Sequence, residues 1–343
     1  MTAESDNAGS AGRLGIQIRP WLFCCAVIAA VVLAIGLRLA ALDSDPYPRL
    51  SWSTGLLTDE GYYIHNARNL VLFGTERTDD FNNMLIMPTL HAVQVAVFKV
   101  WGAGIVQARW ISVTCSLLGV AFLFAAARRA FGITVAVYAA LFNGLDHVNL
   151  LYNRMALMDT PGEMLLIVAF YAWARGANDP SGIARSRVWM AACGAILALA
   201  FATRGLAGVV IAAAIAAAFF SGRQSGRFHG VSESPSRTAG GQWRLGWLCG
   251  GLVVGLAVYA TLWYLPHREE ISRVNHYYLW RQILPNSLPR LALNAANAWF
   301  GDERGAAPFL MRHTPILLLL AAGWLIAKGR KARAVVLGLA PAP

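Results

Sequence analysis

The side chains in this 343-residue chain that could do chemistry fall in a few short polar segments. The first segment, "LLTDEGYYIHNARN", places Thr58 before the acidic pair Asp59 and Glu60. Thr58 can cap a helix whose positive end favours acidic residues, so a simple helix start explains the pair as well as a function does. The pair directly follows an apolar segment, where a partly desolvated carboxylate can act as a base or bind a cation.

Two further segments add charges of both signs. "LLYNRMALMDTP" contains Arg154 and Asp159, and "FATRGLAG" contains Arg204 as its one charge. A guanidinium group at a lipid boundary is a forked donor suited to phosphate, and Asp159 can contribute a second carboxylate. Capping of a helix by Asp159, and snorkelling of the arginines to the membrane surface, explain the same residues without a function.

Aromatic side chains accompany these charges. Tyr62 and Tyr63 follow the acidic pair, where they suit substrate contacts or anchoring to lipid headgroups. A later segment mixes cationic and aromatic groups that suit sugar rings and phosphates, and equally suit an interfacial helix: Arg273, His276, Tyr277 and Arg281.

Composition shows where these segments must be positioned. The chain is 57% hydrophobic and 14% charged, and several apolar runs reach the roughly 20 residues that cross a hydrocarbon core. We therefore predict an all-α, polytopic membrane protein with about eight spans. The predicted spans are 21–42, 105–127, 131–150, 161–174, 188–203, 205–221, 245–265 and 313–327.

The basic residues predict the orientation. The apolar segment 85–101 is better placed flat on the outer surface than as a span, because 15 of the 29 basic residues then lie in the cytoplasm. His91, Gln94 and Lys99 define its polar face, with Leu90, Val93, Val97 and Val100 on the other.

This topology sets the predicted organisation of the chain. Residues 1–20 form a cytoplasmic tail, residues 21–333 the transmembrane domain, and residues 334–343 an incomplete C-terminal segment. Two large loops, 43–104 and 266–312, face outside, and function is expected there.

Several classes of protein are excluded. The net charge of +11 is scattered over short loops, which argues against nucleic acid as a partner. The five cysteines lie in apolar segments without metal-ligand spacing, and no nucleotide-binding loop, GxSxG elbow or HExxH helix occurs. We expect no metal site and no cofactor, although the carboxylates could hold a divalent cation.

The order of "TDEGYY", "YNRMALMD" and "ATRG" along residues 20 to about 330 resembles the GT-C glycosyltransferases, in particular the protein O-mannosyltransferase and aminoarabinose transferase group. The resemblance implies a polyprenyl-phosphate-linked sugar donor and a glycan, lipid or protein acceptor. It also implies that Asp59 is the catalytic base of an inverting transfer, with Glu60 as its supporting partner and Asp159 as a second acidic contributor. Arg154 and Arg204 would face the donor phosphate.

Two other functions fit some of the same features. A lipid or solute transporter also has charges around an outer cavity, and a noncatalytic membrane component could retain this fold. The charges gather at the outer boundary instead of the midplane, which favours the enzyme. We expect it in the plasma (inner) membrane, with its active site facing outside.

Overall fold

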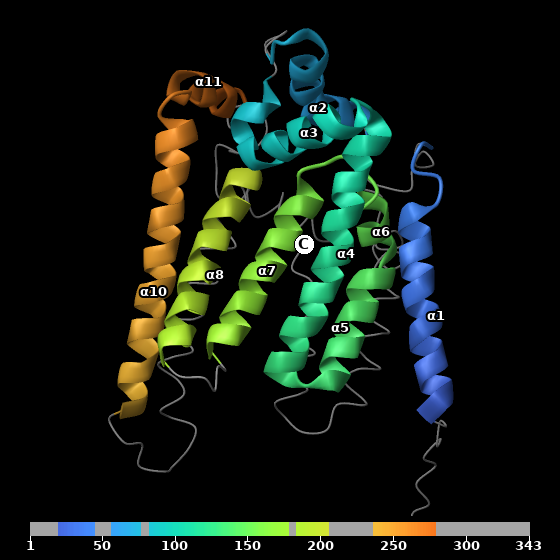
Figure 1. Ribbon diagram of the computed structural model, residues 1–343, viewed down its shortest axis with the longest axis vertical. Helices are drawn as coiled ribbons and strands as arrows, with labels where there is room; N and C mark the ends of the chain where they lie inside the picture. Colours follow the sequence, from blue (N-terminus) through green and yellow to red (C-terminus); the bar gives the residue numbers. More distant parts are fainter. Residues whose placement is uncertain (1–19, 45–55, 77–81, 178–182, 206–235, 279–343) are drawn as a thin grey trace, which may run out of the picture.

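The computed structural model describes residues 20–44, 56–76, 82–177, 183–205 and 236–278 (Figure 1). Every regular element in these ranges is helical, which confirms the all-α prediction. The helices are α1 (Pro20–Leu39), α2 (Leu56–Phe73), η1 (Asn83–Ile86), α3 (Pro88–Trp101), α4 (Ile105–Phe131), α5 (Ile133–Leu145), α6 (His147–Tyr152), α7 (Asp159–Ala177), α8 (Ile183–Thr203), α10 (Ser236–Tyr259), the π-helix η2 (Ala260–Tyr264) and α11 (Arg268–Tyr278).

The long helices form a bundle with a helical cap at one end. Figure 1 shows α1, α4, α5, α7, α8 and α10 along the long axis, with α2, α3 and α11 at the upper end. Among the described residues, three segments are long and apolar enough to cross a membrane, namely Ile105–Phe131, Ile183–Thr203 and Trp243–Tyr264. Shorter apolar helices at Val27–Leu39 and Ile133–Leu145 run beside them. The chain is therefore an integral membrane protein.

Within the described residues, the predicted spans overlap helices whose bounds differ by several residues: α1 ends at Leu39, and α7 is not among the three segments that are long and apolar enough to cross a membrane. The predicted span 131–150 is divided at Asp146, whose carboxylate accepts a hydrogen bond from Asn149 N at 2.9 Å and so caps α6. The predicted spans 205–221 and 313–327 and the terminal segments 1–19 and 334–343 lie outside the described residues, apart from Gly205. The number of spans stays a prediction.

The helix predicted over 85–101 is present as α3 in the cap, but its faces are assigned wrongly in part. His91 and Gln94 are buried, whereas Val93 and Val100 are exposed. α3 packs against α2, and His91 Nε2 lies 3.3 Å from Glu76 Oε1, which follows α2 in the same loop. Tertiary contacts in the cap therefore override the predicted division of α3 into a solvent-facing polar face and a buried apolar face.

The bundle is held together by close helix contacts. α8 packs against α7 and α10, and α4 packs against α5 and α7. A Cβ atom on Gly251 of α10 would lie 2.0 Å from Ala191 O of α8, and one on Gly194 would lie 2.0 Å from Leu248 O. Only glycine permits this approach, which is typical of helix pairs in membranes.

The π-helix at the top of α10 turns the chain into α11. There Trp263 Nε1 donates to Leu85 O at 3.0 Å, and Trp263 packs with Ile271 against Met84 and Leu85. A π-turn shifts side chains by one position relative to an α-helix. It thus lets α10 present Trp263 to the cap and dock α11 beside η1.

Gly251→Ala is expected to destabilise the protein by about 1–3 kcal/mol, because the new methyl group collides with the α8 backbone. The thermal midpoint of the detergent-purified protein measures the effect. Gly250→Ala is the matched control, since nothing lies within 4 Å of its Cβ position. Equal midpoints for the two variants would contradict the close α8–α10 packing.

The cap is expected to lose stability in mild acid. Burial lowers the pKa of His91 below its ordinary value of 6.5, and the hydrogen bond and charge of Glu76, 3.3 Å away, offset part of this effect. Nearby His65 lowers the same pKa further. The unfolded chain therefore takes up this proton first as the pH falls, so stability present above pH 6.5 is lost through the lower folded-state pKa.

Comparing thermal midpoints at about pH 7.5 and pH 5 tests this prediction. His91→Gln should show a smaller drop than the wild type, whereas His147→Gln, at an exposed position, should not. An unchanged drop in His91→Gln would show that other groups set the acid response.

Candidate active site

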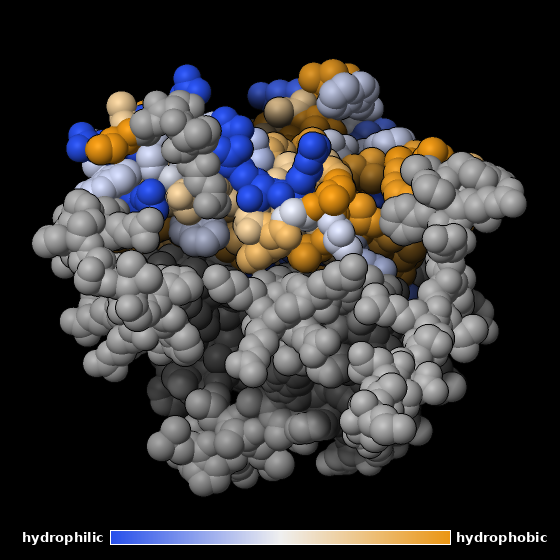
Figure 2. Space-filling model, turned by 90° about the horizontal axis from the view of Figure 1, so that it is seen from below, coloured by the Kyte–Doolittle hydropathy of each residue, from blue (hydrophilic) through white to orange (hydrophobic). Residues whose placement is uncertain are grey.

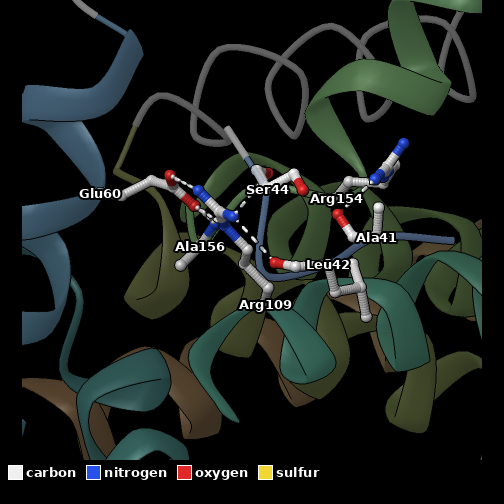
Figure 3. Close-up of polar contacts among 7 residues, drawn as sticks. All are labelled: Ala41, Leu42, Ser44, Glu60, Arg109, Arg154 and Ala156. Carbon is white, nitrogen blue, oxygen red and sulfur yellow. Dashed lines mark hydrogen bonds and ion pairs between the residues drawn. The ribbon is translucent and has the colours of Figure 1, made fainter. Parts of the chain in front are cut away.

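A buried ion pair links three segments at the capped end of the bundle. Glu60 and Arg109 are each 2% exposed, and they meet in a two-pronged contact (Figure 3). Arg109 Nε donates to Glu60 Oε1 at 2.9 Å, and Arg109 Nη2 donates to Glu60 Oε2 at 2.6 Å. Ala156 N donates to the same Oε1 at 2.7 Å. The carboxylate of Glu60 thereby joins α2, α4 and the loop before α7.

Two arginines fix the chain where it leaves α1. Arg109 Nη1 donates to Leu42 O at 2.8 Å and to Ser44 O at 3.0 Å. Arg154 Nη2 donates to Ala40 O and, at 2.9 Å, to Ala41 O, where the backbone has a φ of 49°. These carbonyls lie in the turn that follows Leu39, where Ala41 O also accepts from Ser44 N at 3.2 Å, so the guanidinium groups fix the chain just after α1 ends. Arg154, which the sequence predicts to bind phosphate, therefore also holds the chain directly after α1.

The second ion pair of the site is open to solvent. Arg204 Nη1 lies 2.5 Å from Asp159 Oδ1, with the side chains 37% and 30% exposed. Asp159 begins α7, and Arg204 directly follows α8. Gly162 makes room for this contact, since a Cβ there would lie 3.3 Å from Arg204 Cβ. The structure thus brings together two of the residues that the sequence singles out.

The pair has unused capacity for a ligand. Arg204 Nε is buried and, within the described part of the chain, has no hydrogen-bond partner. An exposed ion pair contributes little to stability, so a bound anion can replace one partner at small cost. Arg204 can therefore donate hydrogen bonds to a phosphate, while Asp159 forms a hydrogen bond with a second polar group.

Below this pair lies a small polar cavity with room for about one water molecule. Its lining includes Ser116, Asn143 and Glu163, and Asn143 Nδ2 donates to Glu163 Oε1 at 3.0 Å. Arg38 is fully buried beside it and donates from Nε to Ser116 Oγ at 2.7 Å and from Nη1 to Gly144 O at 2.7 Å. Arg38 thereby ties α1 to α4 and α5.

The remaining predicted residues fall into three groups. Tyr63 packs with Met155 and Leu157 and so fixes the loop before Asp159, whereas Tyr62 is 46% exposed. Arg273 is exposed on α11. The side chains of Asp59, His276 and Tyr277, and all of Arg281, lie outside the described residues, so their roles stay predictions.

Asp59 nevertheless has a defined place in the chain. It precedes Glu60 in the first turn of α2, and Glu60 is bonded to Ala156, three residues before Asp159. The turn carrying Asp59 is therefore tied to the loop carrying Asp159.

No group of three or more potential metal ligands lies together among the described His, Cys, Asp and Glu residues. Because the side chain of Asp59 is not among them, the expected independence from metal stays a prediction.

Three charged residues of this region are absent from the sequence-based set, namely Arg38, Arg109 and Glu163. All three lie within or at the edge of apolar helices. An ionisable residue inside a membrane span is rare and commonly functional or paired, and this signal was available.

Comparisons with known proteins agree with this architecture. A family model described as dolichyl-phosphate-mannose-protein mannosyltransferase matches residues 87–230. Two solved structures of ArnT from Cupriavidus metallidurans superpose on the chain. The form bound to undecaprenyl phosphate has a TM-score of 0.56 at 19% identity, and the apo form 0.55 at 20%. No curated protein sequence matches.

The extent of these matches defines what they show. The superpositions cover 93% and 92% of this chain but 54% and 57% of ArnT, so the chain spans about half the length of those proteins. The fold is that of the GT-C membrane glycosyltransferases, which confirms the resemblance predicted from the three motifs. Within that class, the chain is similar to ArnT and to the dolichyl-phosphate-mannose-protein mannosyltransferases.

Arg109→Met is expected to destabilise the protein by about 3–5 kcal/mol, because it leaves the Glu60 carboxylate buried without its cation. Adding Glu60→Gln should recover part of the loss, since the double variant has no unpaired buried charge. Denaturant unfolding followed by circular dichroism measures both. Arg68→Met, at an exposed position on α2, is the control. Additive losses in the double variant would mean that the two groups do not interact.

Proposed function

We propose that the protein transfers a sugar from a polyprenyl-phosphate donor to an acceptor on the extracytoplasmic side of the membrane. The observation that carries the proposal is the half-exposed Asp159–Arg204 pair, tied through Ala156 and Glu60 to the turn that carries Asp59. Both comparisons point to a glycosyltransferase of the GT-C type. ArnT has been solved with undecaprenyl phosphate bound, which supports a lipid-linked donor for this chain as well.

The proposed chemistry is a displacement at the anomeric carbon. An acceptor hydroxyl forms the new bond to carbon, and the bond from carbon to the phosphate oxygen breaks with its electron pair going to the lipid phosphate. Asp59 takes the proton of the hydroxyl, which makes a single-step, inverting transfer. Glu60 supports this carboxylate from the neighbouring position.

The cations act on the leaving group. Arg204 has an unpaired Nε and an exposed guanidinium edge, so it can stabilise the negative charge that develops on the phosphate. Among the described residues, Arg154 donates from Nη2 to the carbonyls of Ala40 and Ala41, and in this proposal its Nε and Nη1 face the same phosphate. When the phosphate draws Arg204 away, Asp159 becomes available to a sugar or acceptor hydroxyl.

The cap supplies the other substrate contacts in this proposal. Tyr62 is exposed on α2, and Arg273 is exposed on α11 next to the positions of His276 and Tyr277. Aromatic and cationic groups on two elements of the cap suit a sugar ring and its phosphate. We place the acceptor between these elements, in the plasma membrane's outer face.

Asp59→Asn is expected to lower the transfer rate by about 10²–10⁴. The assay incubates purified protein with several polyprenyl-phosphate sugars and a cell-envelope extract, and it measures donor sugar consumed and polyprenyl phosphate released. Arg204→Gln should also slow release, because it removes the cation facing the leaving group. Lys99→Gln, at an exposed position on α3 outside the proposed site, is the control for a lost charge.

Gel filtration and the thermal midpoint check that the variants remain folded. Equal rates for the wild type and Asp59→Asn across all donors would overturn the base assignment. Counterflow of a lipid or solute in liposomes, without release of polyprenyl phosphate, would show that the protein is a transporter.

A further inference from the structure

The end of the bundle opposite the candidate active site carries a cluster of arginine and tryptophan side chains. Arg187 of α8 lies 5.8 Å from the ring centre of Trp243 and 5.9 Å from that of Trp247, both on α10. Arg244 lies 5.4 Å from the Trp243 ring, so two guanidinium groups share one indole. We call these four residues the arginine–tryptophan cluster.

Among the described side chains, the charged residues around the cluster are all arginines. The described arginines at this end belong to the ends of α4, α7, α8 and α10 that point downward in Figure 1. They are Arg128, Arg129, Arg175, Arg185, Arg187 and Arg244. Every acidic side chain in the described ranges belongs instead to the cap or to the upper part of the bundle, from Asp43 to Glu270.

Charge in this cluster is not neutralised by the described residues. Neither Arg187 nor Arg244 takes part in any of the ion pairs found there. Arg244 Nε and Arg175 Nε are buried nitrogens without a hydrogen-bond partner in the same ranges. Two like charges on one indole repel each other, so a bound anion gains from both and satisfies the free donors.

The surroundings of the cluster indicate which anion it meets. In the coloured part of Figure 2, which views the molecule from below, hydrophilic and hydrophobic residues lie side by side. Trp247 is 46% exposed, and Val253 and Val254 of the same helix, one to two turns nearer the cap, are 64% exposed. Exposed valines on a spanning helix face hydrocarbon, and tryptophan is enriched at the level of the headgroups. An anion at this level is a lipid phosphate.

We propose that the arginine–tryptophan cluster binds the headgroup of an anionic membrane phospholipid, with Arg187 and Arg244 as the phosphate donors. Trp243 holds the two guanidinium planes by cation–π contact, so that their donors point outward in a fixed arrangement. The site is separate from the proposed donor site, because it lies at the other end of the bundle, and it does not depend on catalysis.

Lipid retention in native mass spectrometry tests the proposal on the purified full-length chain. Phosphatidylglycerol is expected to bind more tightly than phosphatidylcholine with the same acyl chains. Arg187→Gln/Arg244→Gln should weaken phosphatidylglycerol binding by about tenfold or more, since each arginine near a charged lipid surface contributes about 1 kcal/mol. Arg68→Gln, on α2 in the cap, is the matched control and should bind like the wild type.

A second variant keeps the proposal falsifiable if the first unfolds. Arg187→Lys/Arg244→Lys retains both charges but loses the forked donors, so binding should fall by an intermediate factor. The proposal is overturned if the wild type does not distinguish the two phospholipids, or if the folded glutamine variant retains phosphatidylglycerol.

Two competition arms distinguish the anion sources. Millimolar inorganic phosphate should not displace the lipid, and undecaprenyl phosphate should not displace it more strongly than phosphatidylglycerol itself. Displacement by free phosphate would identify an ion site, and preferential displacement by undecaprenyl phosphate a donor-lipid site. Either result would contradict the assignment to a bulk phospholipid.

Discussion

The arrangement of the capped end depends on the buried pair of Glu60 and Arg109. Two charges removed from water are tolerated only if their hydrogen-bonding capacity is satisfied, and here Arg109 also meets Leu42 O and Ser44 O, while Glu60 also meets Ala156 N. The pair therefore cannot form unless α1 has ended, α2 has begun and the loop before α7 is in place. Because every hydrogen-bonding group of this buried ion pair needs a partner, the pair specifies the relative positions of three segments that are far apart in the chain.

The capped end contains one ion pair that holds the structure together and a second ion pair that can exchange partners. Glu60 and Arg109 are saturated by each other and by the backbone, which leaves no group for substrate. Asp159 and Arg204 are exposed enough to exchange partners, and Gly162 keeps the space that lets Arg204 reach across α7. The buried Glu60–Arg109 pair already holds the loop before α7 through Ala156 N. Binding of a ligand at Arg204 therefore does not have to order this loop as well.

The sequence was sufficient for the bundle and for part of the site. Long apolar runs predict helices without knowledge of their neighbours, so α4, α8 and α10 agree with the predicted spans. Asp159 and Arg204 could be recognised as site candidates because each lies at a short polar turn next to a predicted span. Arg109 could not be assigned to Glu60, since 49 residues separate them and only the folded loop brings them together. The faces of α3 failed for the same reason, because His91 is paired with Glu76 in the loop after α2, a contact that a periodicity in α3 alone does not contain.

The two ends of the bundle carry side chains of opposite charge, and each end needs a different kind of partner. Acidic side chains in the described ranges lie toward the cap, where Glu60 and Glu163 are each held by buried or polar partners, and arginines gather at the other end, where Arg187 and Arg244 take part in none of the ion pairs found in these ranges. A carboxylate that acts as a base, as we propose for Asp59, must be held in position, which needs protein partners. An arginine at the opposite end needs only an anion, and the bilayer supplies anions in the plane where Trp243 and Trp247 lie. Protein contacts therefore fix the reactive end, while contacts with lipid can fix the depth of the other end without competing for the same side chains.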